Sequence, residues 1–296
     1  SQTITVQGTG QNLFLVSAAQ GDVSVSTNGA QTIVAGQAGQ FGGITLSGGT
    51  VGGANANIFG ALNQSIQTSG ELRVIGGTDS VGRASAVINT NANQTIAAKS
   101  ITVQAVSGPV SSGIFVPNGN QTINTTGAAA NGYGITVENI GATGPDQVGV
   151  ASTAFIVDRV GNQIIDVANS NGILISASGG DAAGIFGEGV NQSITIHGSG
   201  ANELVIAGGA GLAQVFSNGP QTIVAGLTGQ SGGISIQGGT KSGAIAQIYD
   251  ASGTQSITTT GILSLTGGTA PAIAPFNLDQ LDCLPACASV HSQAGL

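Results

Sequence analysis

The sequence predicts an all-β protein, a right-handed parallel β-helix (a solenoid) of about nine coils with three strands in each. A Gln-Thr-Ile or Gln-Ser-Ile tripeptide begins segments all along the chain, and short apolar stretches alternate with stretches rich in Gly, Asn and Ser. No stretch has the periodicity of a helix of useful length. The 40% of hydrophobic residues and the 6% of charged residues argue against disorder.

The repeat unit begins at a glutamine and is about thirty residues long. Its length ranges from 27 residues, between Gln94 and Gln121, to 42 residues, between Gln121 and Gln163. Each unit contains three predicted strands, which in the second unit cover 31–35, 43–48 and 54–59. Each strand is expected to pair with its counterpart in the next coil, about 4.8 Å along the axis.

Equivalent residues of successive coils stack in this fold, so a repeated glutamine predicts a ladder of side-chain amides. The predicted ladder includes Gln31, Gln64, Gln94, Gln121, Gln192, Gln221 and Gln255. The isoleucine two positions after each of these glutamines is predicted to form an interior column.

A second predicted column is aromatic and lies five or six residues before the next glutamine. Its members are Phe59, Phe115, Phe186, Phe216 and Tyr249. We interpret them as a stack in the core, with an exposed aromatic platform that binds sugars as the alternative.

A longer repeat is superimposed on the short one. Residues 31–50 match residues 221–240 without a gap, with 14 of 20 positions identical. Coils one to three therefore resemble coils seven to nine, as expected if whole coils were duplicated.

The two ends of the repeat region suggest that the protein assembles with itself. We predict a repeat domain over 1–269, and over 270–296 a degenerate coil followed by a cysteine-containing tail. The sequence enters its first strand at once, and 270–280 resembles a degenerate third strand. An uncapped sheet edge is a template for another chain, and a head-to-tail contact generates a filament. The predicted subunit contacts are Gln2, Ile4, Val6, Ile273, Phe276 and Leu278.

The tail contains the only two cysteines, Cys283 and Cys287. In an exported protein such a pair predicts a disulfide, within one chain or between two. Asp279 and His291 extend the same four-residue spacing, which on a helix would align four metal ligands, although Pro285 disfavours that helix. We predict no metal and no cofactor.

Several functional classes are disfavoured. Five basic residues and a net charge of −8 argue against nucleic acid, and the lack of a long apolar run argues against a membrane span. The acidic residues are dispersed, so we expect no enzyme; the alternative, a polysaccharide lyase or hydrolase, would place its site near 124–162. Asp158, Arg159 and Asp166 are interpreted as a solvated corner with a local ion pair.

The strings QTI, GGITLSGGT and NQSI resemble the repeat region of filamentous haemagglutinin-like exoproteins, and CLPACASV is similar to the tails they often carry. These are bacterial two-partner secretion adhesins with a right-handed parallel β-helix, and the resemblance covers roughly 1–269. It implies secretion, display at the bacterial cell surface, and adhesion or matrix formation; a start at Ser1 fits a mature exported chain. We therefore expect a secreted structural subunit that assembles with itself into an extracellular filament. The alternative is an adhesin fragment whose wall binds glycans or cell surfaces.

Overall fold

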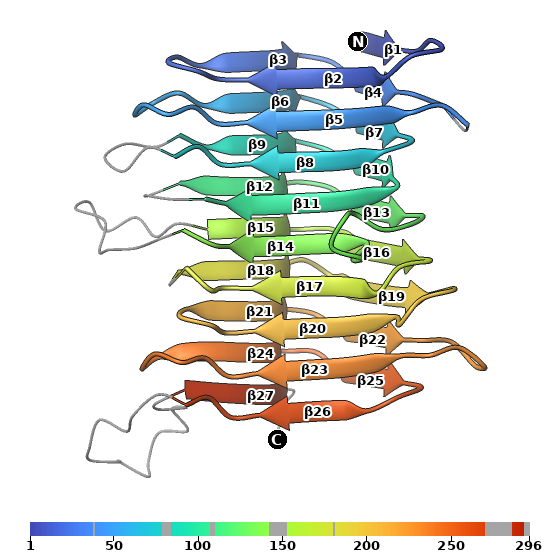
Figure 1. The fold of residues 1–296 in the computed structure, drawn as a ribbon. Helices are drawn as coiled ribbons and strands as arrows, with labels where there is room; N and C mark the ends of the chain where they lie inside the picture. Colours follow the sequence, from blue (N-terminus) through green and yellow to red (C-terminus); the bar gives the residue numbers. More distant parts are fainter. Residues whose placement is uncertain are drawn as a thin grey trace.

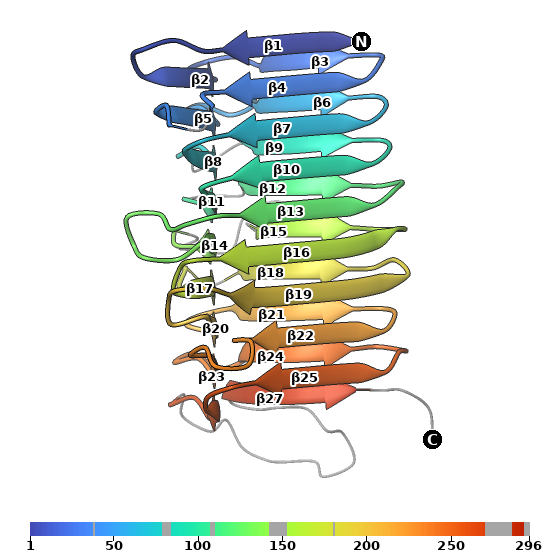
Figure 2. The same ribbon diagram turned by 90° about the vertical axis from the view of Figure 1, so that its right-hand side faces the viewer.

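The computed structural model describes residues 1–37, 39–78, 84–106, 110–141, 153–179, 181–269 and 286–292. These residues form a right-handed parallel β-helix in which three consecutive strands make one coil. Figures 1 and 2 show the coils stacked in a straight column, with the first coil at one end and the last at the other. The predicted fold class is confirmed.

Three parallel sheets of nine strands each form the walls of the column. The first sheet contains β1 (Gln2–Val6), β4 (Gln31–Ala35), β7 (Gln64–Thr68), β10 (Gln94–Ala98), β13 (Gln121–Thr125), β16 (Asn162–Ala168), β19 (Asn191–His197), β22 (Gln221–Ala225) and β25 (Gln255–Thr259). The second sheet contains β2 (Asn12–Ser17), β5 (Gly42–Ser47), β8 (Glu71–Ile75), β11 (Ser100–Ala105), β14 (Ile135–Asn139), β17 (Gly172–Ser176), β20 (Glu203–Ala207), β23 (Gly233–Gln237) and β26 (Leu263–Thr266). The third sheet contains β3 (Val23–Thr27), β6 (Ala56–Gly60), β9 (Ala86–Thr90), β12 (Ser111–Val116), β15 (Thr153–Asp158), β18 (Ala182–Gly187), β21 (Leu212–Ser217), β24 (Ala244–Asp250) and β27 (Ala286–Ser292).

The strands pair in the register that the repeat predicts. In the first sheet every opening glutamine pairs with the opening glutamine of the next coil, from Gln2 with Gln31 to Gln221 with Gln255. The 42-residue unit keeps this register, since Gln121 pairs with Gln163. Its described extra residues, 126–134, lie in the connection between β13 and β14.

The apolar core runs through the inside of the column. Successive side chains of a strand point to opposite faces, so alternate residues are buried. In β16, Ile165 is 1% exposed while its neighbour Ile164 is 46% exposed. The isoleucines that follow each glutamine form a continuous inner column, as expected.

The duplicated coils also share their turn geometry. Gly36 and Gly226 have φ values of 72° and 81°, in the left-handed region that favours glycine. Each turn is closed by a backbone hydrogen bond, from Gln40 to Gln37 (2.9 Å) and from Gln230 to Leu227 (2.8 Å). The sequence likeness of these coils thus extends to their local conformation.

The final coil corrects one prediction. The strand that pairs with β24 is β27, and not the predicted degenerate strand over 270–280, which lies outside the described residues. Ala288 and Val290 of β27 pack against the core, whereas Cys287 and His291 pair with the outward-facing Ile245 and Tyr249. Part of the cysteine-containing tail therefore belongs to the repeat.

Candidate assembly and binding surfaces

The glutamine ladder is continuous across all nine coils. The side-chain Nε2 of each glutamine donates to the Oε1 of the preceding one, over distances of 2.7–3.0 Å from Gln31 to Gln255. Gln163, which the prediction omitted, is also a member. A buried amide without partners destabilises a fold, so this ladder compensates for the burial of a polar column.

The ladder has a fixed direction along the column. The Nε2 of Gln192 also donates to the backbone carbonyl of Phe216 in the same coil at 3.1 Å, and Gln64 and Gln121 make corresponding bonds to Asn89 and Val157. An amide oxygen in the place of this nitrogen would face a carbonyl oxygen. In these coils the carbonyls therefore orient the amide with its nitrogen toward the first coil.

A second ladder, which the sequence analysis missed, lies outside the first. Asn93, Asn120, Asn162 and Asn191 are linked one to the next by side-chain hydrogen bonds of 2.8–3.4 Å. The recurring Asn-Gln dipeptide was the signal for it.

The aromatic column is on the outside of the third sheet, so its interpretation as a core stack is wrong. Phe59, Phe115, Phe186, Phe216 and Tyr249 are all half-buried, while the residue before each of them is fully buried. The rings of Phe186 and Phe216 have centroids 6.4 Å apart, and those of Phe216 and Tyr249 are 5.5 Å apart. His291 stacks on Tyr249 at 5.5 Å with an interplanar angle of 6°.

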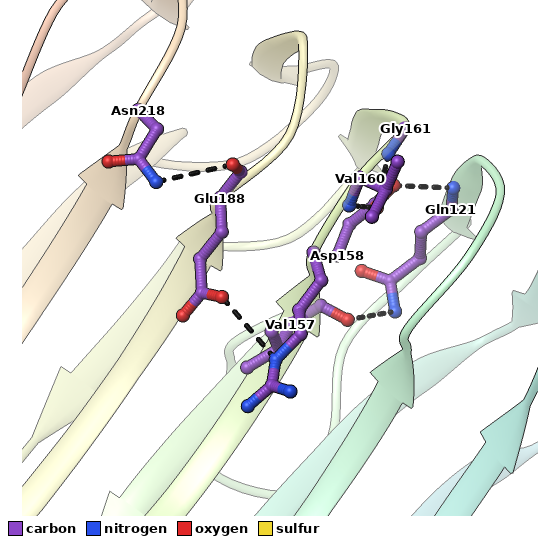
Figure 3. A network of polar contacts seen from close by, with 8 residues as sticks. Gln121, Val157, Asp158, Val160, Gly161, Glu188 and Asn218 are labelled. Carbon is purple, nitrogen blue, oxygen red and sulfur yellow. Dashed lines mark hydrogen bonds and ion pairs between the residues drawn. The ribbon is translucent and has the colours of Figure 1, made fainter.

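The three residues of the predicted polar corner have separate roles. Asp158 is fully buried and accepts hydrogen bonds from the backbone N–H groups of Gln121 (3.0 Å), Val160 (3.2 Å) and Gly161 (2.9 Å), as Figure 3 shows. Arg159 pairs instead with Glu188 of the next coil at 3.5 Å.

Asp166, the third of them, contacts the ring of His197 at 2.8 Å. The expected solvated corner with a local ion pair is therefore wrong.

Burial raises the pKa of the Asp158 carboxyl above its ordinary value. Its three backbone hydrogen bonds act in the opposite direction and offset part of this effect. One of them comes from Gln121, the first residue of the same unit, so Asp158 ties the end of its coil to the start of that coil. Its position indicates a structural role.

The predicted subunit contacts fall into two groups. Gln2, Ile4 and Val6 lie in the edge strand β1 and are half-buried, although the corresponding residues of β4 are fully buried. Ile273, Phe276 and Leu278 lie outside the described residues. At the other end, Leu263 and Leu265 of β26 point inward beneath Ile234 and Ile236 and are each 46% exposed.

The disulfide between Cys283 and Cys287 stays a prediction, because Cys283 lies outside the described residues. Cys287 and His291 lie in a strand, so the helical spacing that would align four metal ligands does not occur. Over the described ranges, no three His, Cys, Asp or Glu side chains group as a metal site would require, and no helix is long and apolar enough to cross a membrane. Comparison of the chain with models of protein families, with curated proteins and with solved structures found no match.

Proposed function

We propose that this chain is a secreted structural subunit that assembles head to tail into an extracellular filament. The observation that carries the proposal is that β1 and the final coil present complementary edges of one continuous register. Apolar side chains, the direction of the glutamine ladder and the scarcity of charged side chains all favour the same contact.

The apolar contribution comes from inward-facing side chains at each end. Leu263 and Leu265 are each 46% exposed, and Ile4 and Val6 are half-buried. A second copy stacked on the final coil would place its β1, β2 and β3 against β25, β26 and β27. The exposed leucines would then be covered as Ile234 and Ile236 are covered within the chain, and burial of apolar surface favours association.

The hydrogen-bond contribution follows from the direction of the ladder. Among the described residues the Nε2 of Gln2 has no glutamine before it, and the Oε1 of Gln255 has none after it. In a head-to-tail contact, Gln2 of one copy would donate to Gln255 of the next. The contact would therefore extend the ladder without reversing an amide.

The first and last coils also carry few charged side chains that could repel a second copy. Asp22 is the only charged side chain in residues 2–29, and residues 251–269 contain none. Like charges at a sheet edge are a common device against edge-to-edge pairing, and here they are nearly absent. The resemblance to secreted bacterial exoproteins supports a location outside the cell.

Sedimentation velocity and negative-stain electron microscopy of the purified chain at micromolar concentration test the proposal. We expect concentration-dependent filaments with a subunit repeat of roughly 45 Å, for nine coils of about 4.8 Å each. The same measurements in reductant would show whether a disulfide joins the subunits.

A matched pair of variants at the edge strand makes the test specific. Gln2 N–H and Val6 C=O bond to the next coil, so in a parallel ladder the N–H of Thr5 faces the open edge. Thr5→Pro removes that donor and should leave monomers, whereas Thr5→Val keeps it and should still assemble. A wild-type chain that stays monomeric, or a Thr5→Pro variant that assembles normally, would overturn the proposal.

A further inference from the structure

We infer that the outer face of the third sheet carries a binding site for a neutral, extended polysaccharide. The site is a hollow in the outward aromatic column, where Val157 stands between Phe115 and Phe186. It does not depend on head-to-tail assembly, because it lies on the wall in the middle of the column.

A single small residue creates the hollow. Val157 pairs with Phe115 of β12 on one side and with Phe186 of β18 on the other. The shorter side chain leaves an open groove of about 440 Å³ between the two rings, lined also by Phe155, Arg159 and Glu188. A concave apolar surface with a few polar groups is the usual form of a ligand site.

Two glycines make room for the aromatic lining. Phe155 pairs with Gly113 and Gly184, and a Cβ added to Gly113 would lie 2.1 Å from the Phe155 ring. At Gly184 an added Cβ would lie 2.6 Å from the ring of Phe186. Each ring therefore lies flat against the wall, over a glycine that has no side chain, and the two rings give the groove a broad aromatic lining.

One ion pair forms the polar rim. Arg159 lies 3.5 Å from Glu188, and its guanidinium is 5.2 Å from the centroid of the Phe115 ring. The Arg159 and Glu188 side chains are 60% and 37% exposed, so their donors and acceptors are accessible from the groove. Their charges cancel, which leaves hydrogen-bonding groups without a net charge.

These features select the class of ligand. A sugar ring has an apolar face that packs on an aromatic ring and hydroxyl groups at its edge that bond to charged side chains. The neutral lining and the net charge of −8 disfavour an acidic polysaccharide or a nucleic acid. The outward row of Phe115, Val157, Phe186, Phe216 and Tyr249 follows the solenoid axis, since each of these residues pairs with the next. A ribbon-like chain of sugars can follow it, whereas a coiled one cannot.

Isothermal titration calorimetry with the full chain tests the site, using cellohexaose and mannohexaose as extended neutral probes. Maltohexaose, which coils, and an oligogalacturonate, which is acidic, serve as comparison ligands. We expect binding of at least one extended probe and weaker binding of both comparison ligands. Failure of both extended probes to bind, or tighter binding of the acidic one, would overturn the inference.

Three variants locate the binding. Phe186→Ala removes one wall of the groove and should weaken binding about tenfold. Phe41→Ala removes an aromatic ring that is 83% exposed next to β5 of the second sheet, away from the groove, and should leave the affinity unchanged. Val157→Phe would place a ring between those of Phe115 and Phe186 and fill the hollow, so it should abolish binding.

Stronger binding by Val157→Phe would show that a flat row of rings binds the ligand and that the hollow does not. Lateral self-association that is lost in Phe186→Ala would instead assign this face to a second copy of the chain. Either result would overturn the inference, and circular dichroism of each variant would verify that it folds.

Discussion

The side chains of Gln163 and Gln192 are joined by a buried hydrogen bond of 2.8 Å, from the Nε2 of Gln192 to the Oε1 of Gln163. The bond connects two coils at the same corner where Gln192 also bonds to the carbonyl of Phe216. A polar column inside an apolar solenoid is stabilising only when every amide finds its partners. The ladder therefore links each coil energetically to the next.

Replacing one ladder glutamine should expose this dependence. Gln192→Ala removes a donor to Gln163 and an acceptor for Gln221, and leaves buried polar atoms without partners. We expect urea denaturation to show a loss of about 3 kcal/mol in the free energy of unfolding. Gln214→Ala is the control, because Gln214 makes a similar amide bond to Gln247 on the half-buried outer wall, and its loss should cost less than about 1 kcal/mol. Equal costs would contradict a special role of the ladder.

Two adjacent isoleucines provide a test of which face is buried. Ile165→Ala should reduce the free energy of unfolding by about 2–5 kcal/mol, since it leaves a cavity in the core. Ile164 is 46% exposed on the outside, and Ile164→Ala should change stability by less than about 0.5 kcal/mol. The two values come from the same denaturation assay, and a reversed order would refute the register of β16.

Asp158 should give the stability a measurable pH dependence. Its pKa is raised by burial, so the folded state holds a proton that the unfolded state releases above a pKa of about 3.9. This contribution favours folding at low pH and is lost as the pH rises through the higher folded pKa. Asp158→Asn lacks it, so the free energy of unfolding of the wild type should rise relative to that of the variant as the pH falls from about 7 to about 4. Parallel curves of unfolding free energy against pH would contradict the raised pKa.

Gly→Ala substitutions at two glycines with positive φ separate the cost of backbone strain from the cost of a steric clash. Gly172 has a φ of 114°, and a Cβ there would lie 2.0 Å from the carbonyl oxygen of Glu203, whereas Gly229 has a φ of 82° and faces open space. Gly229→Ala should cost about 1 kcal/mol from conformation alone. Gly172→Ala should cost about 3 kcal/mol or more, because the neighbouring strand must also move. Thermal denaturation of both variants would measure the difference, and similar values would contradict the close approach.

Much of the fold could be predicted because a solenoid repeats its local chemistry. The recurrence of Gln and of Ile two positions later set the register of the first sheet, even across the 42-residue unit between Gln121 and Gln163. The register holds because each inward position meets its own counterpart in the next coil. The final coil was harder, because β27 lacks the repeat's usual residues and was placed only by its pairing with β24.

The sequence did not show whether the aromatic side chains point into the core or outward, because each follows another apolar residue, as Tyr249 follows Ile248. Either residue could point inward, and the tendency of aromatic rings to be buried favoured the wrong choice. A weaker signal was present, since Gln247 alternates with Ala246 and Ile248 in β24 and shares its face with the column of outward rings.

The sequence by itself determined the three-stranded coil, the glutamine ladder and the apolar interior, because these follow from residues repeated at one spacing. Only the tertiary structure decided that the rings of Phe115 and Phe186 face outward and that Val157 opens a groove between them. Residues that lie one above another in that groove are separated along the chain by a whole coil. Their contacts depend on how the coils stack, which no local pattern specifies.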